Sequence, residues 1–356
     1  MKIGLLGYGT VGRGVYDILK EGGAHEVVKI LRRKQNVPEG DGLFTADPNE
    51  VLLSDDIDLV VEVMGGDEPA FTYMKTAMQA GKHVVTANKQ AVAEHLPELH
   101  EIARKNGVKF AYEASCGGGI PFLKALCSIA EFDTIHRVNA IVNGTTNYVL
   151  TEMGRGQTFD GALESAKLNG FAEADPSADL SGADSVRKLA IMASLAYHTY
   201  VEPSNIYARG LYGVSKEFTS ALAQNGYVLK YMAQAALYGD EVSLSVQPVA
   251  VPSDSPFASV NDEFNAVEIS AERNGRLFFS GKGAGRYPTA SAVVSDIVDI
   301  SRGADGMEFT AKKGVTPSKT VEKGDYFVFM DGSCVKTCGV SCAEACARGF
   351  AAKILK

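Results

Sequence analysis

The sequence predicts an α/β protein, with a parallel-sheet domain at its N-terminus and an α+β domain after it. Two observations carry this prediction. Apolar runs typical of buried strands, such as 2–6, 58–64 and 82–86, alternate with helix-like stretches of about 10–15 residues. A glycine-rich turn also joins the first of these strands to the first helix. Because crossover helices connect such strands, the sheet is parallel, and ligands are expected at the carboxyl ends of its strands.

The composition restricts the class of protein further. A length of 356 residues favours two domains, and a net charge of −8 argues against nucleic acid or an anionic membrane as the main partner. No apolar run reaches the roughly 18–20 residues that span a bilayer. The N-terminus is typical of a first strand rather than of a signal peptide. We therefore expect a cytoplasmic protein whose six cysteines are reduced.

The glycine-rich turn has the sequence Gly7-Tyr8-Gly9-Thr10-Val11-Gly12, between strand 2–6 and a helix that ends near residue 22. This order is the dinucleotide-binding fingerprint of a Rossmann-type domain. Gly7 permits the tight turn, Gly9 lets the backbone approach a pyrophosphate, and Gly12 lets helix and strand pack closely. The N–H groups of the helix N-terminus, at Thr10 and Val11, then face the phosphates.

The cofactor preference is predicted from the end of the second strand, 26–31. Enzymes that prefer NAD place an acidic residue about twenty positions past the glycines, where it binds the ribose 2′-hydroxyl. Arg32, Arg33 and Lys34 occupy that place here. Three positive charges would attract a 2′-phosphate, so we expect NADP to be preferred over NAD. The alternative is a solvated basic turn.

Two further loops follow strands of the predicted sheet. Lys89 lies just past the end of strand 82–86 and is expected near the nicotinamide, unless it is an ordinary surface lysine. The loop 113–121 contains three consecutive glycines, so its backbone carbonyls can coordinate a cation or simply form a turn. Cys116 in this loop has no evident histidine partner, and we interpret it as a small buried residue rather than a nucleophile.

An acidic stretch, 170–188, contains Glu173, Asp175, Asp179 and Asp184 and ends with Arg187 and Lys188. The pattern becomes helical at Asp184, which places Asp184 and Lys188 four apart on one helix face. A lysine beside carboxylates can deliver a proton, and free carboxylates can hold the ammonium group of an amino acid. The alternative is a solvated acidic loop that caps a helix.

In the second half, strands are expected at 137–142, 242–251 and 325–330, and helices at 160–169, 184–197, 226–239 and 288–300. Four cysteines near the C-terminus, Cys334, Cys338, Cys342 and Cys346, recur every four residues. One continuous helix would spread them over about 18 Å, too far for a single ion to bind all four. A break at Gly339 would leave Cys342 and Cys346 adjacent. A thiolate metal site, a redox-sensitive disulfide, pairing between subunits and simple helix packing all stay open.

Over about residues 1–303 the chain resembles homoserine dehydrogenase. The resemblance rests on the glycine turn, Val-Glu-Val-Met-Gly-Gly (61–66), Thr-Ala-Asn-Lys (86–89), Glu-Ala-Ser-Cys-Gly-Gly-Gly-Ile-Pro (113–121), Asn-Gly-Thr-Thr-Asn-Tyr (143–148), the 170–188 stretch and the segment 283–296. It implies a homodimeric oxidoreductase of threonine and methionine biosynthesis. Its reaction would be the NAD(P)-linked interconversion of L-homoserine and L-aspartate 4-semialdehyde.

The resemblance also implies roles for individual residues. Lys188 matches the catalytic lysine that donates a proton to the aldehyde oxygen, and Glu173 matches the carboxylate that holds the substrate amino group. Asp179 and Asp184 match further active-site acids, and Lys89 a second lysine at the nicotinamide end. The remaining matches are Gly285 at the cofactor and the backbone oxygens of Glu113, Cys116, Gly118 and Ile120 around a monovalent cation such as sodium.

The expected domains are 1–135 for the dinucleotide, completed by about 281–303, then 136–280 for substrate, catalysis and dimerisation, and a tail at 304–356 with the four cysteines. Two alternatives compete with the leading hypothesis: an aspartate or diaminopimelate type of amino-acid dehydrogenase, and a non-catalytic dinucleotide sensor. The 170–188 and 283–296 segments argue against the first alternative. The presence of Lys188 and Glu173 argues against the second.

Overall fold

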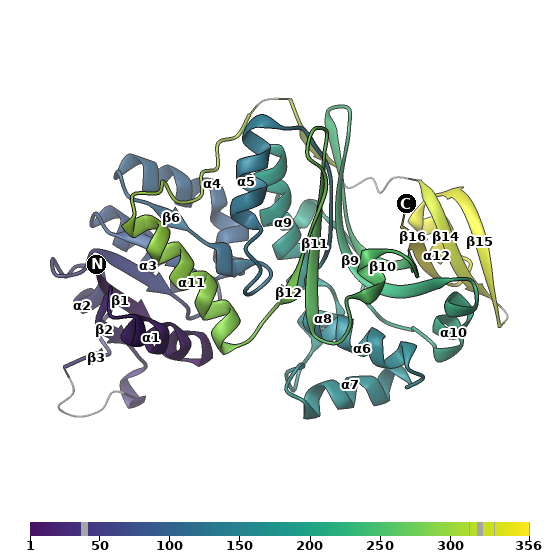
Figure 1. Ribbon diagram of the computed structural model, residues 1–356, viewed down its shortest axis with the longest axis horizontal. Helices are drawn as coiled ribbons and strands as arrows, with labels where there is room; N and C mark the ends of the chain where they lie inside the picture. The colour runs from purple at the N-terminus through teal and green to yellow at the C-terminus, as the bar shows by residue number, and fades with distance from the viewer. Residues whose placement is uncertain (37–41, 313, 319–322, 331, 356) are drawn as a thin grey trace. The chain divides into compact units, whose positions relative to one another are not determined.

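The computed structural model describes residues 1–36, 42–312, 314–318, 323–330 and 332–355 (Figure 1). Its internal contacts divide the chain into two compact units. The first comprises Met1–Glu131, Ser194–Tyr200 and Ala284–Ala311, and the second comprises Phe132–Ala193, Val201–Gly283 and Lys312–Lys356. No helix of the described ranges is long and apolar enough to cross a membrane.

The first unit contains a six-stranded sheet in the order β3-β2-β1-β4-β5-β6, with every neighbouring pair parallel. The strands are β1 (Lys2–Leu6), β2 (Glu26–Leu31), β3 (Phe44–Thr45), β4 (Leu59–Glu62), β5 (His83–Thr86) and β6 (Phe110–Ala111). The helices are α1 (Thr10–Gly22), α2 (Asn49–Leu52), α3 (Ala70–Gln79), α4 (Lys89–Lys105), α5 (Leu123–Phe132) and α11 (Arg286–Ser301), with short 3₁₀ turns at Lys34–Asn36 and Glu113–Ser115. The predicted parallel α/β architecture is confirmed.

The core of this unit joins segments that are far apart in the sequence. Ile3, Leu5 and Val15, from β1 and α1, belong to one buried cluster with Val293 and Ile297 of α11. The two helices approach so closely that a Cβ added at position 14 would lie 2.9 Å from the Ala290 Cβ. Burial of this apolar surface, at about 25 cal/mol per Å², ties the late segment to the first strand.

The second unit contains a mixed ten-stranded sheet in the order β12-β11-β7-β9-β10-β16-β14-β15, with β8 and β13 also paired to β10. The strands are β7 (Ile135–Ile141), β8 (Tyr207–Ala208), β9 (Tyr227–Tyr238), β10 (Glu241–Pro252), β11 (Phe264–Ala271), β12 (Gly275–Lys282), β13 (Thr316–Ser318), β14 (Gly324–Met330), β15 (Ser333–Val340) and β16 (Phe350–Ile354). The helices are α6 (Gly144–Gly154), α7 (Phe159–Leu168), α8 (Ser177–Leu180), α9 (Ala183–Tyr197), α10 (Lys216–Gln224) and α12 (Cys342–Cys346), with 3₁₀ turns at Pro203–Asn205 and Pro256–Ser259. The last turn of α9, from Ser194, groups with the first unit.

One local prediction is wrong. The helix expected over 226–239 is the strand β9, which pairs with β10 along its whole length and with β7 on its other side. Its Leu, Lys, Met, Gln and Ala residues are good helix formers, and pairing with distant strands overrides that preference. Of the two arrangements considered for the four cysteines, a single continuous helix is absent from the described residues, because Cys334 and Cys338 lie on β15. Cys342 and Cys346 do share one helix, α12, as the interrupted pattern predicts.

Residues after 303 do not form a separate body. Residues 304–311 group with the first unit, and the chain from Lys312 groups with the second. β16 pairs in parallel with β10 and antiparallel with β14, so the C-terminal strands extend the sheet of the second unit. The short helix α12 covers this part of the sheet, and Cys342 and Ala345 pack against Tyr326 and Val328 of β14 (Figure 1).

Candidate active site

The glycine turn between β1 and α1 has the geometry that a dinucleotide pyrophosphate requires. Gly7 adopts a φ of +102°, which favours glycine, and a Cβ on Gly12 would lie 2.2 Å from the Gly7 carbonyl oxygen. A Cβ on Gly9 would meet nothing within 4 Å, so that side of the turn is open. The N–H groups of Thr10 and Val11 are in the first turn of α1, where a helix offers them no acceptor. The turn therefore presents backbone donors and a helix dipole to a phosphate.

Arg32, at the end of β2, is held between aromatic rings. Its guanidinium carbon lies 5.5 Å from the Tyr8 ring centroid and 5.1 Å from that of Phe44. Both contacts are within the range of cation–π attraction, which fixes the cation near the glycine turn. Arg33, the next residue, is exposed. The side chain of Lys34, the third predicted cation, lies outside what the structure describes.

The loops after β4 and β5 are held together by two buried side chains. Glu62 accepts hydrogen bonds from the Met64 N–H at 2.7 Å and the Thr86 hydroxyl at 2.5 Å, and burial raises the pKa of this carboxyl. Asn88 caps α4 by accepting the N–H groups of residues 90 and 91, and it donates to the Gly66 carbonyl at 2.6 Å. Lys89 is consequently the first residue of α4, next to a rigid cap, and its side chain is half-buried.

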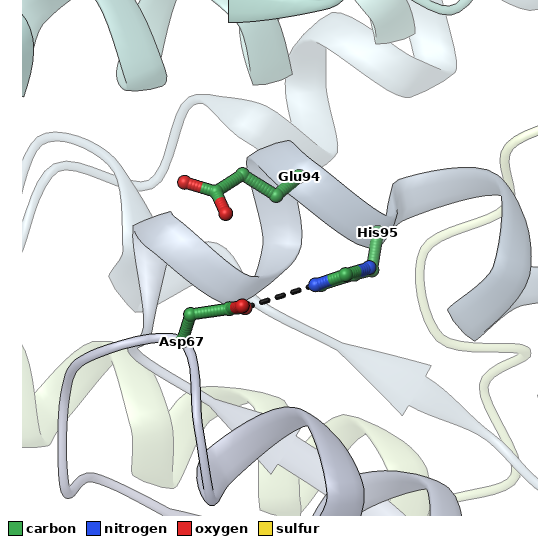
Figure 2. Close-up of side chains that lie close together, drawn as sticks. All are labelled: Asp67, Glu94 and His95. Carbon is green, nitrogen blue, oxygen red and sulfur yellow. Dashed lines mark hydrogen bonds and ion pairs between the residues drawn. The ribbon is translucent and has the colours of Figure 1, made fainter.

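Asp67, in the loop after β4, lies close to Glu94 and His95 of α4, a cluster that the sequence analysis missed. Figure 2 shows the imidazole pointing at the Asp67 carboxylate, with Nε2 2.9 Å from Oδ1. In the described ranges these three form the one group of three or more His, Cys, Asp or Glu side chains whose ligand atoms lie within 4.8 Å of one another. The non-helical backbone of His95, two residues before Pro97, turns its ring out of the regular helix and onto Phe71.

The loop 113–121 is built around the Glu113 carboxylate. It accepts hydrogen bonds from the Leu123 N–H at 2.7 Å and the Lys124 N–H at 2.9 Å, and thus caps α5. Burial raises the pKa of Glu113 to about 7, and burial likewise raises that of Asp296, which accepts the Glu113 N–H, to about 6. Cys116 is fully buried, so its interpretation as a small buried residue is confirmed.

In the second unit, a single asparagine joins the acidic stretch to the lysine. Asn143 caps α6 through its Oδ1 atom, and its Nδ2 atom donates to Asp179 at 2.7 Å and to Asp184 at 3.0 Å. Asp184 in turn accepts from Lys188 Nζ at 2.8 Å. The Lys188 Nζ atom also donates to the Val142 carbonyl at 2.6 Å, immediately before the cap. The predicted pairing of Asp184 with Lys188 on one helix face is confirmed.

The members of this network differ in exposure. Asp184 and Lys188 are buried, at 7% and 9% of their accessible surface, whereas Asp179 is half-buried. Thr145 adds a second hydrogen bond to Asp179, at 2.8 Å. Glu173 lies outside the network, on an exposed loop. Asn143 and Thr145 were not predicted as site residues, although the polar run directly after a buried strand was a usable signal.

Comparison with known proteins agrees with this arrangement. Residues 7–113 match the family model described as the NAD binding domain of homoserine dehydrogenase, and residues 121–298 match that of homoserine dehydrogenase. The homoserine dehydrogenase of Bacillus subtilis is 38% identical over 316 residues, which cover 85% of this chain and 73% of that protein.

Solved structures give the same result. The crystal structure of a homoserine dehydrogenase from Thiobacillus denitrificans has a TM-score of 0.85 at 33% identity, covering 93% of this chain and 84% of that one. A hyperthermophilic archaeal homoserine dehydrogenase in complex with NADPH has a TM-score of 0.75 at 27% identity, with coverages of 86% and 99%. With both halves of the sequence matched and the fold shared, the chain belongs to the homoserine dehydrogenase family of oxidoreductases.

Proposed function

We propose that this protein interconverts L-aspartate 4-semialdehyde and L-homoserine, with Lys188 as the proton donor and acceptor and NADP(H) as the preferred hydride carrier. The observation that carries this proposal is the buried lysine whose Nζ atom is held by Asp184 and by the Val142 carbonyl. When bound, the nicotinamide supplies or accepts the hydride. Side chains of the protein would bind the substrate and supply or accept the proton.

Reduction of an aldehyde creates negative charge on its oxygen, and a positioned proton donor stabilises that charge. The ammonium group of Lys188 has three protons, and two point to the Asp184 and Val142 oxygens. We assign this ammonium group to donate a proton to the aldehyde oxygen of a bound substrate. In the oxidation direction the same nitrogen accepts the proton of the alcohol, so the rate of homoserine oxidation should rise with pH.

The substrate ammonium requires carboxylate acceptors. Glu173 has an exposed carboxylate, and we assign it to the substrate amino group. Asp179 accepts from Asn143 and Thr145 on one side, and a carboxylate with about four lone-pair sites retains acceptors for a ligand. Asn143 thereby couples the acid that faces the substrate to the acid that orients Lys188.

The preference for NADP rests on Arg32 and Arg33. Stacking on Tyr8 and Phe44 restricts the Arg32 guanidinium, which reduces the entropy lost when it pairs with a 2′-phosphate. The open glycine turn, with Gly285 at the start of α11, would hold the rest of the dinucleotide. Lys89, at the N-terminus of α4, is assigned to the nicotinamide end of the site.

Three further assignments complete the proposal. The backbone oxygens of Glu113, Cys116, Gly118 and Ile120 would bind a monovalent cation such as sodium. The consecutive positive-φ residues Gly117 and Gly118 support this assignment, because they fold the loop tightly. The protein would act as a homodimer. Its location would be the cytoplasm.

The test is nicotinamide absorbance with purified protein, L-homoserine and either NADP or NAD. Turnover with homoserine, but not with aspartate or diaminopimelate, would support the proposed substrate. A higher kcat/KM with NADP than with NAD would support the assignment of the two arginines. A folded protein that binds dinucleotide but turns over none of these substrates would contradict the proposal and favour a sensor.

A further inference from the structure

Cys342 and Cys346, at the two ends of α12, form a dithiol that the proposed reaction does not use. Their Sγ atoms lie 3.7 Å apart. The Tyr207 hydroxyl is 3.1 Å from the Cys342 sulfur, and Arg209 Nη1 donates to the Cys346 sulfur at 2.6 Å. Gln247 Oε1 accepts from the Cys342 thiol at 3.3 Å. Three side chains from β8, β10 and the segment after β8 therefore converge on the pair.

Arg209 is fixed in place beside the thiols. Its Nη2 atom donates to the Ala351 carbonyl, and its guanidinium carbon lies 4.7 Å from the Phe350 ring centroid. A cation held against a thiol stabilises the thiolate, which is the nucleophilic form of cysteine. Arg209 contacts Cys346, whose sulfur lies 3.7 Å from that of Cys342, so the guanidinium can stabilise a negative charge shared by the pair.

When the pair ionises, Cys342 can carry the charge, because the Cys346 thiol and the Tyr207 hydroxyl can both donate hydrogen bonds to its sulfur. Ionisation of Cys342 breaks its hydrogen bond to Gln247 but gains hydrogen bonds from the Cys346 thiol and the Tyr207 hydroxyl. Led by the hydrogen bond from Cys346, and with help from Tyr207 and Arg209, these interactions lower the pKa of Cys342 to about 6, although burial opposes the change. The hydrogen bond to Cys342 raises the pKa of Cys346, which keeps its proton.

Other cysteines of the chain lack this environment. Burial raises the pKa of Cys127 to about 12, and it also raises the pKa of Cys334. Cys338 is exposed on β15. Cys342 and Cys346 thus lie where a cation, a phenol and a second thiol come together.

We propose that Cys342 is a modification site for hydrogen peroxide and that Cys346 is its resolving thiol. The Cys342 thiolate attacks one peroxide oxygen, the O–O bond breaks, and hydroxide leaves, so that the sulfur becomes a sulfenic acid. The Cys346 sulfur then attacks the Cys342 sulfur. Water leaves with the sulfenic oxygen and the Cys346 proton, and a disulfide forms. The two sulfurs together lose the two electrons that reduce the peroxide.

The burial of Cys342 favours a small oxidant over a bulky one. Cys342 is only 2% exposed, and we expect this burial to hinder the bulky glutathione disulfide much more than a molecule as small as peroxide. Residues four apart on a helix have Cβ atoms about 5–6 Å apart, whereas a disulfide prefers about 3.5–4.5 Å. Closing the bond therefore distorts the single turn of α12. Because Cys342 and Ala345 pack on Tyr326 and Val328, oxidation would weaken the packing of α12 against β14.

Peptide mapping of the unmodified full chain after limited peroxide treatment tests the proposal directly. Glu344 lies between the two cysteines, so trypsin and a glutamate-specific protease together yield the fragments 337–344 and 345–348. A disulfide between Cys342 and Cys346 holds these fragments together until a dithiol reductant is added. Titratable thiols in the unfolded protein should fall by two from the initial six.

Three variants separate the steps. Cys346→Ser should accumulate a sulfenic acid on Cys342, trapped as a dimedone adduct, and Cys342→Ser should give neither adduct nor linked fragments. Cys338→Ser, in the same tryptic peptide, is the matched control and should oxidise as the unmodified chain does. Linkage through Cys338, equal reaction of all six thiols, no reaction with peroxide, or equally fast modification by glutathione disulfide would each overturn the proposal. These readouts report sulfur chemistry alone, so they do not depend on turnover of homoserine.

Discussion

Replacing Lys188 by methionine is the sharpest test of the proposed mechanism. Methionine keeps a side chain of similar length in a site that is 9% exposed, but it cannot donate a proton. The change removes the hydrogen bonds from Nζ to the Val142 carbonyl, at 2.6 Å, and to Asp184, at 2.8 Å. Asp184 keeps its hydrogen bond from Asn143 at 3.0 Å, so its carboxylate does not lose every partner.

Two separate effects follow, one on catalysis and one on stability. Loss of a positioned proton donor lowers kcat by about 10²–10⁴-fold, which corresponds to about 3–5 kcal/mol of activation free energy. Removal of one partner from a buried ion pair costs the folded state about 3–5 kcal/mol, and the remaining bond from Asn143 should keep the cost at the lower end. We therefore expect a folded protein with a lower Tm, unchanged affinity for the dinucleotide, and a kcat at least a hundredfold below that of the unmodified chain.

The assay is nicotinamide absorbance with L-homoserine, with calorimetry for Tm and NADPH fluorescence for cofactor affinity. Lys167→Met is the matched control, because Lys167 pairs with Glu164 at 2.9 Å on the surface, and such pairs contribute about 0–1 kcal/mol. Lys188→Arg should also stay inactive, since guanidinium does not give up its proton in proteins. A folded Lys188→Met protein with a kcat within tenfold of normal would refute the reasoning.

Three other predictions concern the first unit. Replacing Arg32 and Arg33 by glutamine should lower kcat/KM for NADP by about 10–100-fold and leave NAD unaffected, because a hydrogen bond to a charged group contributes about 1.5–3 kcal/mol; an unchanged ratio of the two rates would contradict the assignment. Gly12→Ala should abolish NADPH binding in a fluorescence titration, because its Cβ would lie 2.2 Å from the Gly7 oxygen, and a normal Kd would show that the turn adapts. Folded Glu113 keeps its proton up to about pH 7, whereas the unfolded chain releases it near 4.5, so stability falls as pH rises between these values, by about 3 kcal/mol. Glu113→Gln should make the fall in denaturant-measured stability between pH 5 and 8 shallower, and an equally steep fall would argue against a raised pKa.

Local sequence patterns were sufficient to predict the structure where it depends on contacts between residues close together in the chain. The turn at Gly7–Gly12 and the pair Asp184–Lys188 both follow from spacing alone, since a helix or a tight turn fixes which residues meet. The parallel sheet was predictable for the same reason, because alternation of buried strands and helices allows few topologies.

Contacts between distant segments were not predictable in this way. The sequence of β9, Tyr227–Tyr238, suits a helix as well as a strand, and only its pairing with β10 and β7 decides the outcome. The bonds from Asn143 to Asp179 and Asp184 span 36 and 41 residues. Arg209 meets Cys346 across 137 residues. Such long-range contacts depend on the register of the strands throughout the sheet, which no local sequence pattern specifies.

The cluster of Asp67, Glu94 and His95 illustrates a different obstacle. A regular helix over 89–105 would direct the His95 side chain by the usual 100° step from its neighbours. The backbone at His95 departs from helical geometry, and the ring therefore stacks on Phe71 and reaches Asp67. Pro97 signals a kink in the sequence, but the direction in which the kink turns the imidazole depends on what packs around it.

The packing of α1 and α11 in one core has a consequence for folding during translation by the ribosome. At about 5–20 residues per second, a ribosome needs roughly 8–30 s to pass from Glu131 to Ala284. During that interval the apolar face formed by Ile3, Leu5 and Val15 is without the helix that covers it in the finished protein. The nascent chain thus carries an incomplete nucleotide-binding domain through most of its translation, a period in which protection by chaperones is most valuable.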